Sequence, residues 1–223
     1  MEDWRAWSLE RKIGQLFMAG FDGLSPSEGI LDLIGNEALG GVIYFRRNIG
    51  DPGQVAELSR RLQEKNAETA GQPPLFIAID QEGGMVSRID RGITLIPGAM
   101  ALGAAGSAEL AYETAGISGR ELRLMGINVN FAPSLDVNNN PLNPVIGVRS
   151  YGEDPERVGE LGTAAVRGYQ EAGVAATVKH FPDTATPSSI RITGCRSSPT
   201  TPNGWSGSSW RRLSGPSPRA RTR

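Results

Sequence analysis

Residues 41–80 read GVIYFRRNIGDPGQVAELSRRLQEKNAETAGQPPLFIAID, and this stretch indicates the fold class. Its two ends, 41–45 and 74–80, are short apolar runs of the kind that forms buried strands. Between them, Asp51 followed by Pro52 has the chemistry of an N-cap and a first helical residue, which predicts a helix to about Asn66. A strand, a helix and a second strand in this order predict two parallel strands with the helix packed against the sheet.

The same alternation recurs on both sides of this unit. Three further apolar runs predict strands, and two further segments have a helical period or an Asp-Pro start. These are the strands at 15–21, 127–132 and 174–180 and the helices at 108–125 and 154–171. Repeated strand–helix units predict a parallel sheet with helices outside it. The run at 74–80 is apolar throughout, which is typical of a strand covered on both faces.

Two architectures are compatible with this alternation, an open doubly wound sheet and a closed (β/α)8 barrel. The first strand is not followed by Gly-x-Gly-x-x-Gly, so the open nucleotide-binding version loses its main support. Polar residues instead follow successive strands, at Asp80, Asp136 and Lys179, and barrels place their chemistry at this end. Because a full barrel takes roughly 250 residues, we expect residues 1–182 to form an α/β fold, a (β/α)8 TIM barrel truncated after about five βα units.

Composition narrows the class of protein. Of the 223 residues, 39% are hydrophobic, which is enough for a core. The net charge of −1 predicts no general attraction to nucleic acid or to an anionic membrane. No apolar run approaches the ~20 residues of a membrane span, and the start lacks the order of a secretory signal, so we expect a cytoplasmic protein. One cysteine, Cys195, and one histidine, His180, predict neither a disulfide framework nor a zinc site.

The composition changes near residue 183. Residues 183–223 hold seven arginines, no lysine and one acid, Asp183, so their net charge is +6, and their apolar residues follow no strand or helix period. Such a segment cannot bury enough apolar surface to offset its ordering entropy, so a disordered tail is expected. A basic arm for nucleic acid or membrane is the alternative that the charge pattern leaves open.

Two acids and a glycine pair follow the strand at 74–80, in the sequence Ile79-Asp-Gln-Glu-Gly-Gly-Met-Val-Ser-Arg88. Asp80 and Glu82 offer acceptors for hydroxyl groups, and the glycines allow a ligand to approach the backbone. The same residues suit either a carboxylate pair for acid–base chemistry or a simple turn. Arg88 is suited to bind a ligand oxygen or to pair with Glu82 at the surface.

Further polar positions lie near the ends of the later predicted strands. Asp136 either contacts a substrate or hydrogen-bonds the loop backbone. Arg149, in a predicted loop, suits a polyhydroxy or carboxylate ligand, or a surface ion pair. Lys179 and His180 end an otherwise apolar strand, where ionisable groups are costly unless they are satisfied. The lysine beside the histidine favours ligand binding over a purely structural histidine.

Five motifs occur in a fixed order along the chain. They are Leu39-Gly-Gly-Val-Ile-Tyr-Phe45, Ile79-Asp-Gln-Glu-Gly-Gly84, Gly126-Ile-Asn-Val-Asn-Phe-Ala-Pro133, Val145-Ile-Gly-Val-Arg-Ser150 and Lys179-His-Phe-Pro182. Together they strongly resemble glycoside hydrolase family 3, and within it the β-N-acetylhexosaminidase (β-N-acetylglucosaminidase) branch. The resemblance covers about residues 10–182. The Asp-Gln-Glu-Gly-Gly motif favours this branch over the glucosidase branch, which differs after the third strand.

The resemblance implies a (β/α)8 barrel that releases terminal, non-reducing N-acetylglucosamine with retention of configuration and uses no metal or other cofactor. Its motifs assign sugar binding to Asp80, Arg88, Arg149, Lys179 and His180. The implied partner is an N-acetylglucosamine-containing oligosaccharide or a muropeptide, and glucosidase-type specificity is the alternative. Outside the enzyme class, the alternative is an incomplete barrel that holds sugar weakly without catalysis.

The catalytic motifs of the family do not occur in this sequence. In the family, Lys-His-Phe-Pro continues into Gly-His-Gly-Asp-Thr and then Asp-Ser-His, whose aspartate and histidine form the acid/base dyad, and an aspartate nucleophile follows a later strand. Here Pro182 is followed by Asp183, so no catalytic residue is assigned to the chain. One set of codons for residues 189–201 encodes Asp-Ser-His-His-Gly-Leu-Pro-Val-Ile-Pro-His-Asp when it is read from the third base. We therefore expect residues from about 187 onward to be translated out of frame.

Overall fold

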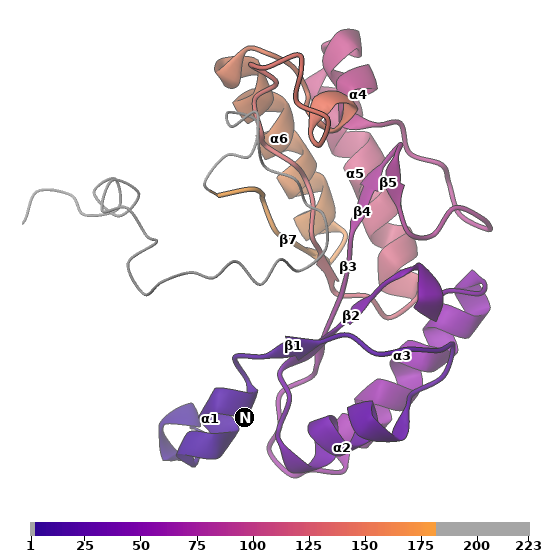
Figure 1. Cartoon of the computed structure of the whole chain (residues 1–223), viewed down its shortest axis with the longest axis vertical. Helices are drawn as coiled ribbons and strands as arrows, with labels where there is room; N and C mark the ends of the chain where they lie inside the picture. The colour runs from indigo at the N-terminus through magenta and orange to yellow at the C-terminus, as the bar shows by residue number, and fades with distance from the viewer. Residues whose placement is uncertain (1–2, 182–223) are drawn as a thin grey trace, which may run out of the picture.

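The computed structural model describes residues 3–181, and the predicted tail therefore lies outside the described residues (Figure 1). Within this part, a main parallel sheet is flanked by helices, and a short hairpin follows its third strand. The strands are β1 (Met18–Ala19), β2 (Gly41–Tyr44), β3 (Phe76–Ile79), β4 (Gln81–Gly83), β5 (Val86–Ser87), β6 (Val129–Asn130) and β7 (Ala175–Ala176). The α-helices are α1 (Leu9–Gly14), α2 (Glu28–Asn36), α3 (Pro52–Ala67), α4 (Ala99–Ala105), α5 (Ala108–Leu124) and α6 (Pro155–Glu171). Short 3-10 helices lie at η1 (Trp4–Ala6), η2 (Arg46–Asn48) and η3 (Gly147–Arg149).

The strands of the main sheet are all parallel and lie side by side in chain order, β1-β2-β3-β6-β7. β2 and β3 pair most extensively, from Gly41 opposite Phe76 to Tyr44 opposite Ile79. Each connection between neighbouring strands carries a helix, which is α2, α3, α5 and α6 in turn. A sheet that always adds its next strand on the same side winds in one direction, as a barrel does, whereas a doubly wound sheet reverses its order. The observed order therefore excludes the doubly wound alternative.

Local capping chemistry starts α3 and α6 where the sequence predicts. The Asp51 side chain accepts a hydrogen bond from the Gln54 backbone N–H at 3.0 Å, and Pro52 is the first helical residue. α6 begins in the same way, with Asp154 as the N-cap. The predicted ends of α3, α5 and α6 are each within one residue of the observed ends, because the turn chemistry that defines them is local in sequence.

Three predicted strands are shorter than expected, and several elements were missed. The run at 15–21 contributes only β1, because the Gln15 N–H still bonds the Arg11 carbonyl at the end of α1. The runs at 127–132 and 174–180 contribute two paired residues each, as β6 and β7. Helices α1, α2 and α4 and the β4–β5 hairpin were not predicted. The sheet therefore has the predicted number of strands and order, with shorter pairing.

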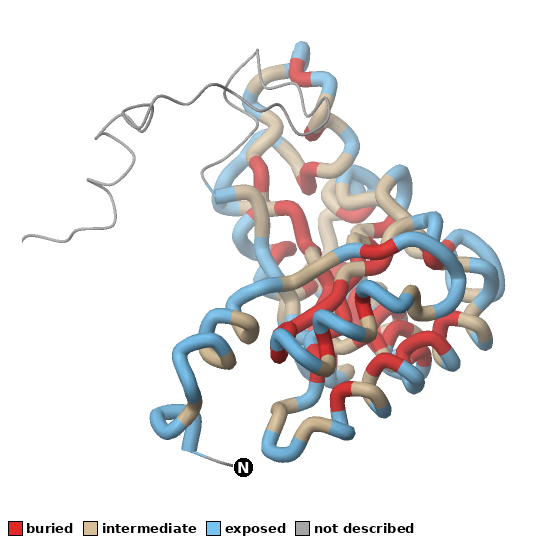
Figure 2. Tube along the Cα trace, turned by 60° about the horizontal axis from the view of Figure 1, so that its bottom comes forward, coloured by how far each residue is buried: buried red, intermediate tan, exposed pale blue. Residues whose placement is uncertain are grey.

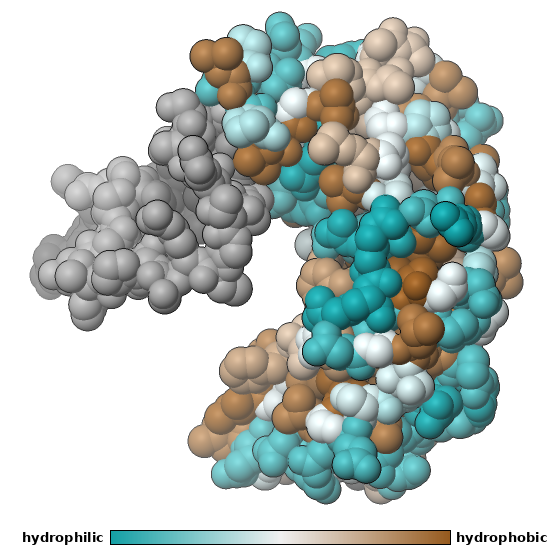
Figure 3. All heavy atoms as spheres, turned by 45° about the vertical axis from the view of Figure 1, so that its right-hand side comes forward, coloured by the Kyte–Doolittle hydropathy of each residue, from teal (hydrophilic) through white to brown (hydrophobic). Residues whose placement is uncertain are grey.

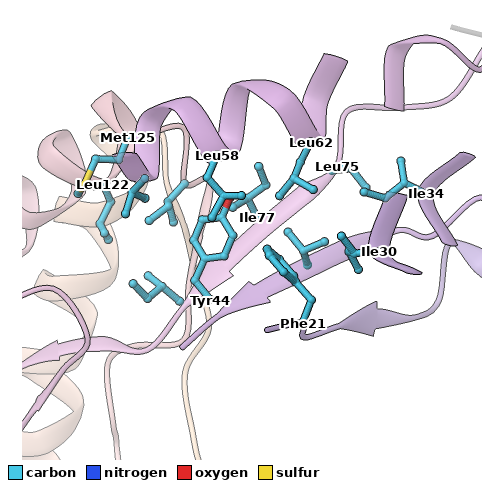
Figure 4. Packing of buried hydrophobic residues seen from close by; sticks show 14 of the residues in the cluster. Phe21, Ile30, Ile34, Tyr44, Leu58, Leu62, Leu75, Ile77, Leu122 and Met125 are labelled. Atoms are coloured by element: carbon cyan, nitrogen blue, oxygen red, sulfur yellow. The ribbon is translucent and has the colours of Figure 1, made fainter. Parts of the chain in front are cut away.

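The larger hydrophobic cluster joins residues of α2 and α3 to residues of the sheet, and Figure 2 shows how buried and exposed residues are distributed along the chain. The face of α3 that packs into this cluster is formed by Val55, Leu58 and Leu62, which are at most 1% exposed. Tyr44 of β2 points into the same cluster (Figure 4), with its hydroxyl 3.0 Å from the Ser59 hydroxyl. Burial raises the pKa of Tyr44, so this phenol is neutral. Burying each leucine or isoleucine here contributes roughly 1.5–3 kcal/mol.

A second cluster joins α5 and α6. Small residues on both helices allow close approach: a Cβ added at Gly168 would lie 2.3 Å from the Tyr112 carbonyl oxygen. Leu161, Tyr169 and Ala115 are buried members of this cluster. This packing holds the third and fourth βα units together and thereby places the loops that follow β6 and β7.

Apolar side chains also reach the surface, where Figure 3 shows them beside hydrophilic ones. Phe76, at the start of β3, is 56% exposed, so the prediction that this strand is covered on both faces is wrong at its first residue. Ile77 and Ile79 are fully buried, as predicted. Leu110 of α5 is also exposed. Between residues 3 and 181, the helices lack the length and apolarity that crossing a membrane requires.

Candidate functional site

Charged side chains gather at the carboxyl ends of strands β3 and β7. Asp80 directly follows β3, Lys179 lies shortly after β7, and Arg88 directly follows β5. Arg149 is the last residue of η3. The carboxyl ends of parallel strands open at the same edge of a sheet, which is why segments so far apart in sequence meet there. With Glu82 of β4, these side chains form a connected set that we call the rim network.

Lys179 is the centre of the rim network. Its Nζ lies 2.9 Å from Asp80 Oδ1 and 2.5 Å from Glu82 Oε1. The side chains of Lys179 and Asp80 are 15% and 18% exposed, and that of Glu82 is 6% exposed. Arg88 Nη2 lies 3.2 Å from Asp80 Oδ2, so each oxygen of this carboxylate has its own cation. A buried charge is tolerated only when it is paired in this way.

Arg149 binds Glu82 through a two-point contact. Nε and Nη2 of Arg149 donate to the two Glu82 carboxylate oxygens at 2.9 and 2.8 Å, and Nη1 donates to the Val145 carbonyl at 3.2 Å. The hydrogen bond with Glu82 raises the pKa of Arg149. Of the two alternatives left open for Arg88, the pairing with Glu82 does not form, because Arg88 pairs with Asp80 while Arg149 and Lys179 pair with Glu82. The fork geometry fixes both side chains of the Arg149–Glu82 pair.

The Asp80 carboxylate is held in its ionised form. Burial opposes the charge, but the hydrogen bond and charge of Lys179, together with Arg88, outweigh burial and lower the pKa of Asp80. A carboxyl group with a lowered pKa is a hydrogen-bond acceptor and a poor proton donor. Of the two interpretations left open for these acids, a general-acid role is therefore disfavoured at Asp80.

His180 forms a second polar group beside the rim network. Its Nδ1 lies 2.6 Å from Oδ2 of Asp136, whose side chain is 0% exposed. The Ser134 hydroxyl donates to the same oxygen at 2.7 Å, and the Ser150 hydroxyl donates to the Asp136 backbone carbonyl at 2.6 Å. The Asp136 side chain thus bonds a side chain of its own loop and a predicted site residue, and substrate contact at Asp136 stays a prediction.

The backbone between Asp80 and Glu82 is clamped from the next strand. The fully buried side chain of Asn130 accepts from the Gln81 N–H at 3.0 Å and donates to the Gln81 carbonyl at 2.8 Å. The Gln81 side chain in turn accepts from the Arg88 N–H at 2.8 Å. The Asn130 amide therefore fixes the backbone from which the Asp80 and Glu82 carboxylates extend, and the Gln81 amide fixes the backbone at Arg88.

Sequence reasoning named the rim residues but missed these supporting groups. Asn128 and Asn130 alternate within an apolar run, and alternate residues of a strand point to the same face. Asn128 accepts from the Ile77 N–H at 2.7 Å and donates to the Leu75 carbonyl at 2.8 Å, so both asparagines extend the pairing of β6 with the β3 segment. Polar residues repeated at a spacing of two in a buried strand are the signal that would have found them.

The arrangement offers hydrogen-bond partners of both kinds. Carboxylates accept from hydroxyl groups, while ammonium and guanidinium groups donate to hydroxyl and carbonyl oxygens. Over the described range 3–181, no three His, Cys, Asp or Glu side chains are grouped so as to hold a metal ion. The rim network therefore presents fixed, charged hydrogen-bond donors and acceptors, which is chemistry that suits a polyhydroxy ligand.

Comparisons with known proteins agree with this geometry. The family model described as the glycosyl hydrolase family 3 N terminal domain matches residues 8–197. Beta-hexosaminidase A of Pseudoalteromonas piscicida is 46% identical over 155 residues, which are 68% of this chain and 26% of that protein. Beta-hexosaminidase of Xylella fastidiosa (strain M23) is 35% identical over 173 residues, 75% of this chain and 50% of that protein. The chain thus spans between a quarter and a half of the length of these relatives.

Solved structures show the same relationship. A glycoside hydrolase family 3 beta-N-acetylglucosaminidase from Paenibacillus sp. str. FPU-7 superposes with a TM-score of 0.79 at 63% identity, over 81% of this chain and 34% of that chain. NagZ from Neisseria gonorrhoeae in complex with N-trifluoroacetyl-D-glucosamine superposes with a TM-score of 0.68 at 32% identity, over 76% of this chain and 51% of that chain. These neighbours confirm the predicted fold class, in which the five parallel strands are part of a TIM barrel.

Proposed function

We propose, from the premise that this chain belongs to glycosyl hydrolase family 3, that its rim network binds a terminal N-acetylglucosamine residue of an oligosaccharide. The activity proposed for the family member is that of a retaining β-N-acetylhexosaminidase. The binding residues are Asp80, Arg88, Arg149, Lys179 and His180. The relatives named beta-hexosaminidase and beta-N-acetylglucosaminidase support this choice of sugar.

The observation that carries the proposal is the state of Asp80. Each of its carboxylate oxygens has one cationic partner, Lys179 on Oδ1 and Arg88 on Oδ2. A carboxylate oxygen accepts about two hydrogen bonds, so each has one acceptor position left for a ligand. Two fixed acceptor positions on one carboxylate suit neighbouring hydroxyl groups of a pyranose. Because the cations already hold the carboxylate in place, binding does not have to order it.

The chain itself is proposed to bind sugar without cleaving it. Retention requires a nucleophile and an acid/base group on opposite sides of the scissile bond. Among the described rim residues, Asp80 and Glu82 are each held by two cations and Asp136 is bound to His180. The sequence has no Asp-Ser-His motif and one histidine. The rim groups therefore recognise the substrate, and they do not supply the missing acid/base dyad.

The natural substrate class proposed is an N-acetylglucosamine-containing oligosaccharide, derived from chitin or, as a muropeptide, from peptidoglycan. Glucosidase-type specificity is the competing candidate. The two differ in the substituent at the second carbon of the sugar, an acetamido group or a hydroxyl group. The amide oxygen of an acetamido group needs a donor, and Lys179 and Arg149 are donors.

Saturation-transfer NMR on the 223-residue chain tests the proposal, with N-acetylglucosamine and glucose as probes. We expect signal transfer to N-acetylglucosamine above that to glucose, and its loss in Asp80→Asn. Asp32→Asn, an exposed aspartate of α2, is the matched control and should bind as the unchanged chain does. Equal or stronger transfer to glucose would overturn the choice of sugar. Turnover of a chromogenic N-acetylglucosaminide by this chain would overturn the statement that it lacks catalysis.

A further inference from the structure

The contact between His180 and Asp136 indicates which ring nitrogen of His180 donates a hydrogen bond and which accepts one. Nδ1 of His180 lies 2.6 Å from Asp136 Oδ2. The aspartate side chain is 0% exposed and the histidine side chain is 24% exposed, so the buried partner lies behind the ring and part of the ring is accessible. His180 is the only histidine in the sequence.

The position of Asp136 is fixed by both loops that meet at the pair. Ser134 bridges to Lys179 in parallel pairing, and the Leu135 N–H donates to the Lys179 carbonyl at 2.6 Å. The Ser134 hydroxyl donates to Asp136 Oδ2 at 2.7 Å. The loop after β6 is therefore tied to the segment after β7 at the residue that precedes His180, and the carboxylate cannot turn away without breaking these bonds.

The chemistry of the contact decides which atom holds the proton. An ionised carboxylate only accepts, so Nδ1 must donate to it. A proton on Oδ2 is disfavoured because that oxygen already accepts from Ser134. In a neutral ring with the proton on Nδ1, Nε2 has a free lone pair and is an acceptor.

We propose that Asp136 is a positioning residue that holds neutral His180 as the Nδ1–H tautomer, so that Nε2 presents an acceptor to a hydroxyl group of the ligand. In this tautomer His180 accepts a hydrogen bond from the sugar through Nε2 and does not donate one to it. The ligand identity rests on the proposed function, whereas the tautomer does not. The site then binds the sugar with hydrogen-bond acceptors at Asp80 and His180 and with donors at Lys179 and Arg149.

A chain labelled with ¹⁵N only at histidine tests this, because a single residue gives both ring nitrogen signals. We expect long-range ¹H–¹⁵N spectra, recorded where the ring is neutral, to show a protonated Nδ1 and a bare Nε2. A protonated Nε2 in the unchanged chain would overturn the proposal without any variant. Asp136→Ala should shift the tautomer toward Nε2–H, with the amide spectrum as the check on folding.

A control and a ligand titration separate this proposal from the proposed function. Glu82→Gln removes a rim carboxylate that touches Lys179 and Arg149 but not the ring, so the tautomer should not change. An equal shift in that variant would contradict a specific role for Asp136. Addition of N-acetylglucosamine should move the Nε2 signal and leave the Nδ1 proton in place, whereas a proton on Nε2 of the neutral ring would contradict the acceptor role. A chain that shows the tautomer but binds no sugar would contradict only the proposed function.

Discussion

Replacing Arg149 by methionine gives a direct measure of what holds the rim together. The variant removes two charge-assisted hydrogen bonds, at 2.8 and 2.9 Å, from a glutamate that is 6% exposed. Breaking a buried ion pair costs about 3–5 kcal/mol, since the remaining charge loses its partner. Lys179 still contacts Glu82 in the variant, so the lower end of that range applies. We expect Arg149→Met to lower the free energy of unfolding by about 3 kcal/mol.

Arg149→Lys separates charge from geometry. Lysine restores a positive charge but offers Glu82 one point of contact in place of the fork, so about half of the loss, roughly 1.5 kcal/mol, should persist. Arg60 of α3 is the matched control, because it too is an arginine paired with glutamate, in its case Glu57 and Glu64, but on the exposed face of a helix. Exposed pairs contribute little, so Arg60→Met should leave the unfolding midpoint close to that of the unchanged chain.

Urea unfolding followed by circular dichroism measures all three variants. The slope of the transition should be unchanged, because the surface exposed on unfolding is nearly the same. A loss of under about 1 kcal/mol in Arg149→Met would refute the reasoning, and so would an equal loss in the lysine and methionine variants. A large effect of Arg60→Met would show that the measurement does not separate buried from exposed pairs.

Three further predictions test the electrostatics and packing that position the site. Because the folded pKa of Asp80 is lowered, the contribution of its charge to the free energy of unfolding is present above its unfolded pKa of about 3.9 and is lost as the pH falls below that value. Urea titrations at pH 6 and pH 3 should therefore show that the difference in stability between the unchanged chain and Asp80→Asn shrinks in acid. A difference that stays constant would contradict this. Gly168→Ala should lower the stability by about 1–3 kcal/mol, because the added methyl group forces α5 and α6 apart. Gly159→Ala in the same helix should raise the stability by up to about 1 kcal/mol, because no atom lies within 4 Å of the added Cβ. Thermal midpoints measure both changes, and changes of the same sign would contradict the packing explanation. Asn130→Asp loses the side-chain donor to the Gln81 carbonyl and buries a charge, so it should lower the free energy of unfolding by about 3 kcal/mol and weaken sugar binding. Unchanged stability in urea would show that the hydrogen bonds of Asn130 to Gln81 are not needed.

The parts of the fold that could be predicted are those with local chemistry. Asp51-Pro52 and Asp154-Pro155 satisfy helix N-termini by themselves, so α3 and α6 begin where the sequence indicates. α4 has no side-chain cap at Gly98 and is seven residues long, so no local signal announces it. The run at 15–21 was misleading because Leu16 and Phe17 are exposed. Apolarity predicts burial only where the tertiary structure provides a covering surface.

In the site, too, the features that depend on local sequence were predictable and those that depend on tertiary structure were not. Its members were predictable, because each charged residue follows a predicted strand end or lies in the loop beside one. Their pairing was not, because Arg149 and Glu82 are 67 positions apart and meet only when η3 and β4 are both in place. Lys179 and Asp80 are 99 positions apart and depend on β6 and β7 being adjacent to β3. Such pairings follow from the order of strands in the sheet, which no single motif contains.

The ion pairs explain how one edge of a sheet can be both stable and ready to bind. If the rim charges had no partners, hydrogen bonds from ligand hydroxyl groups would have to offset the free-energy cost of burying each charge. Instead Lys179 pairs with both Asp80 and Glu82, Arg88 and Arg149 each pair with one of them, and Asp136 accepts from Nδ1 of His180. The protein fold therefore supplies the electrostatic stabilisation, and under the proposed function the sugar adds hydrogen bonds to groups that are already fixed. This is why we expect substitutions at Asn130 and Asp136, which support those groups from behind, to weaken binding as well as stability.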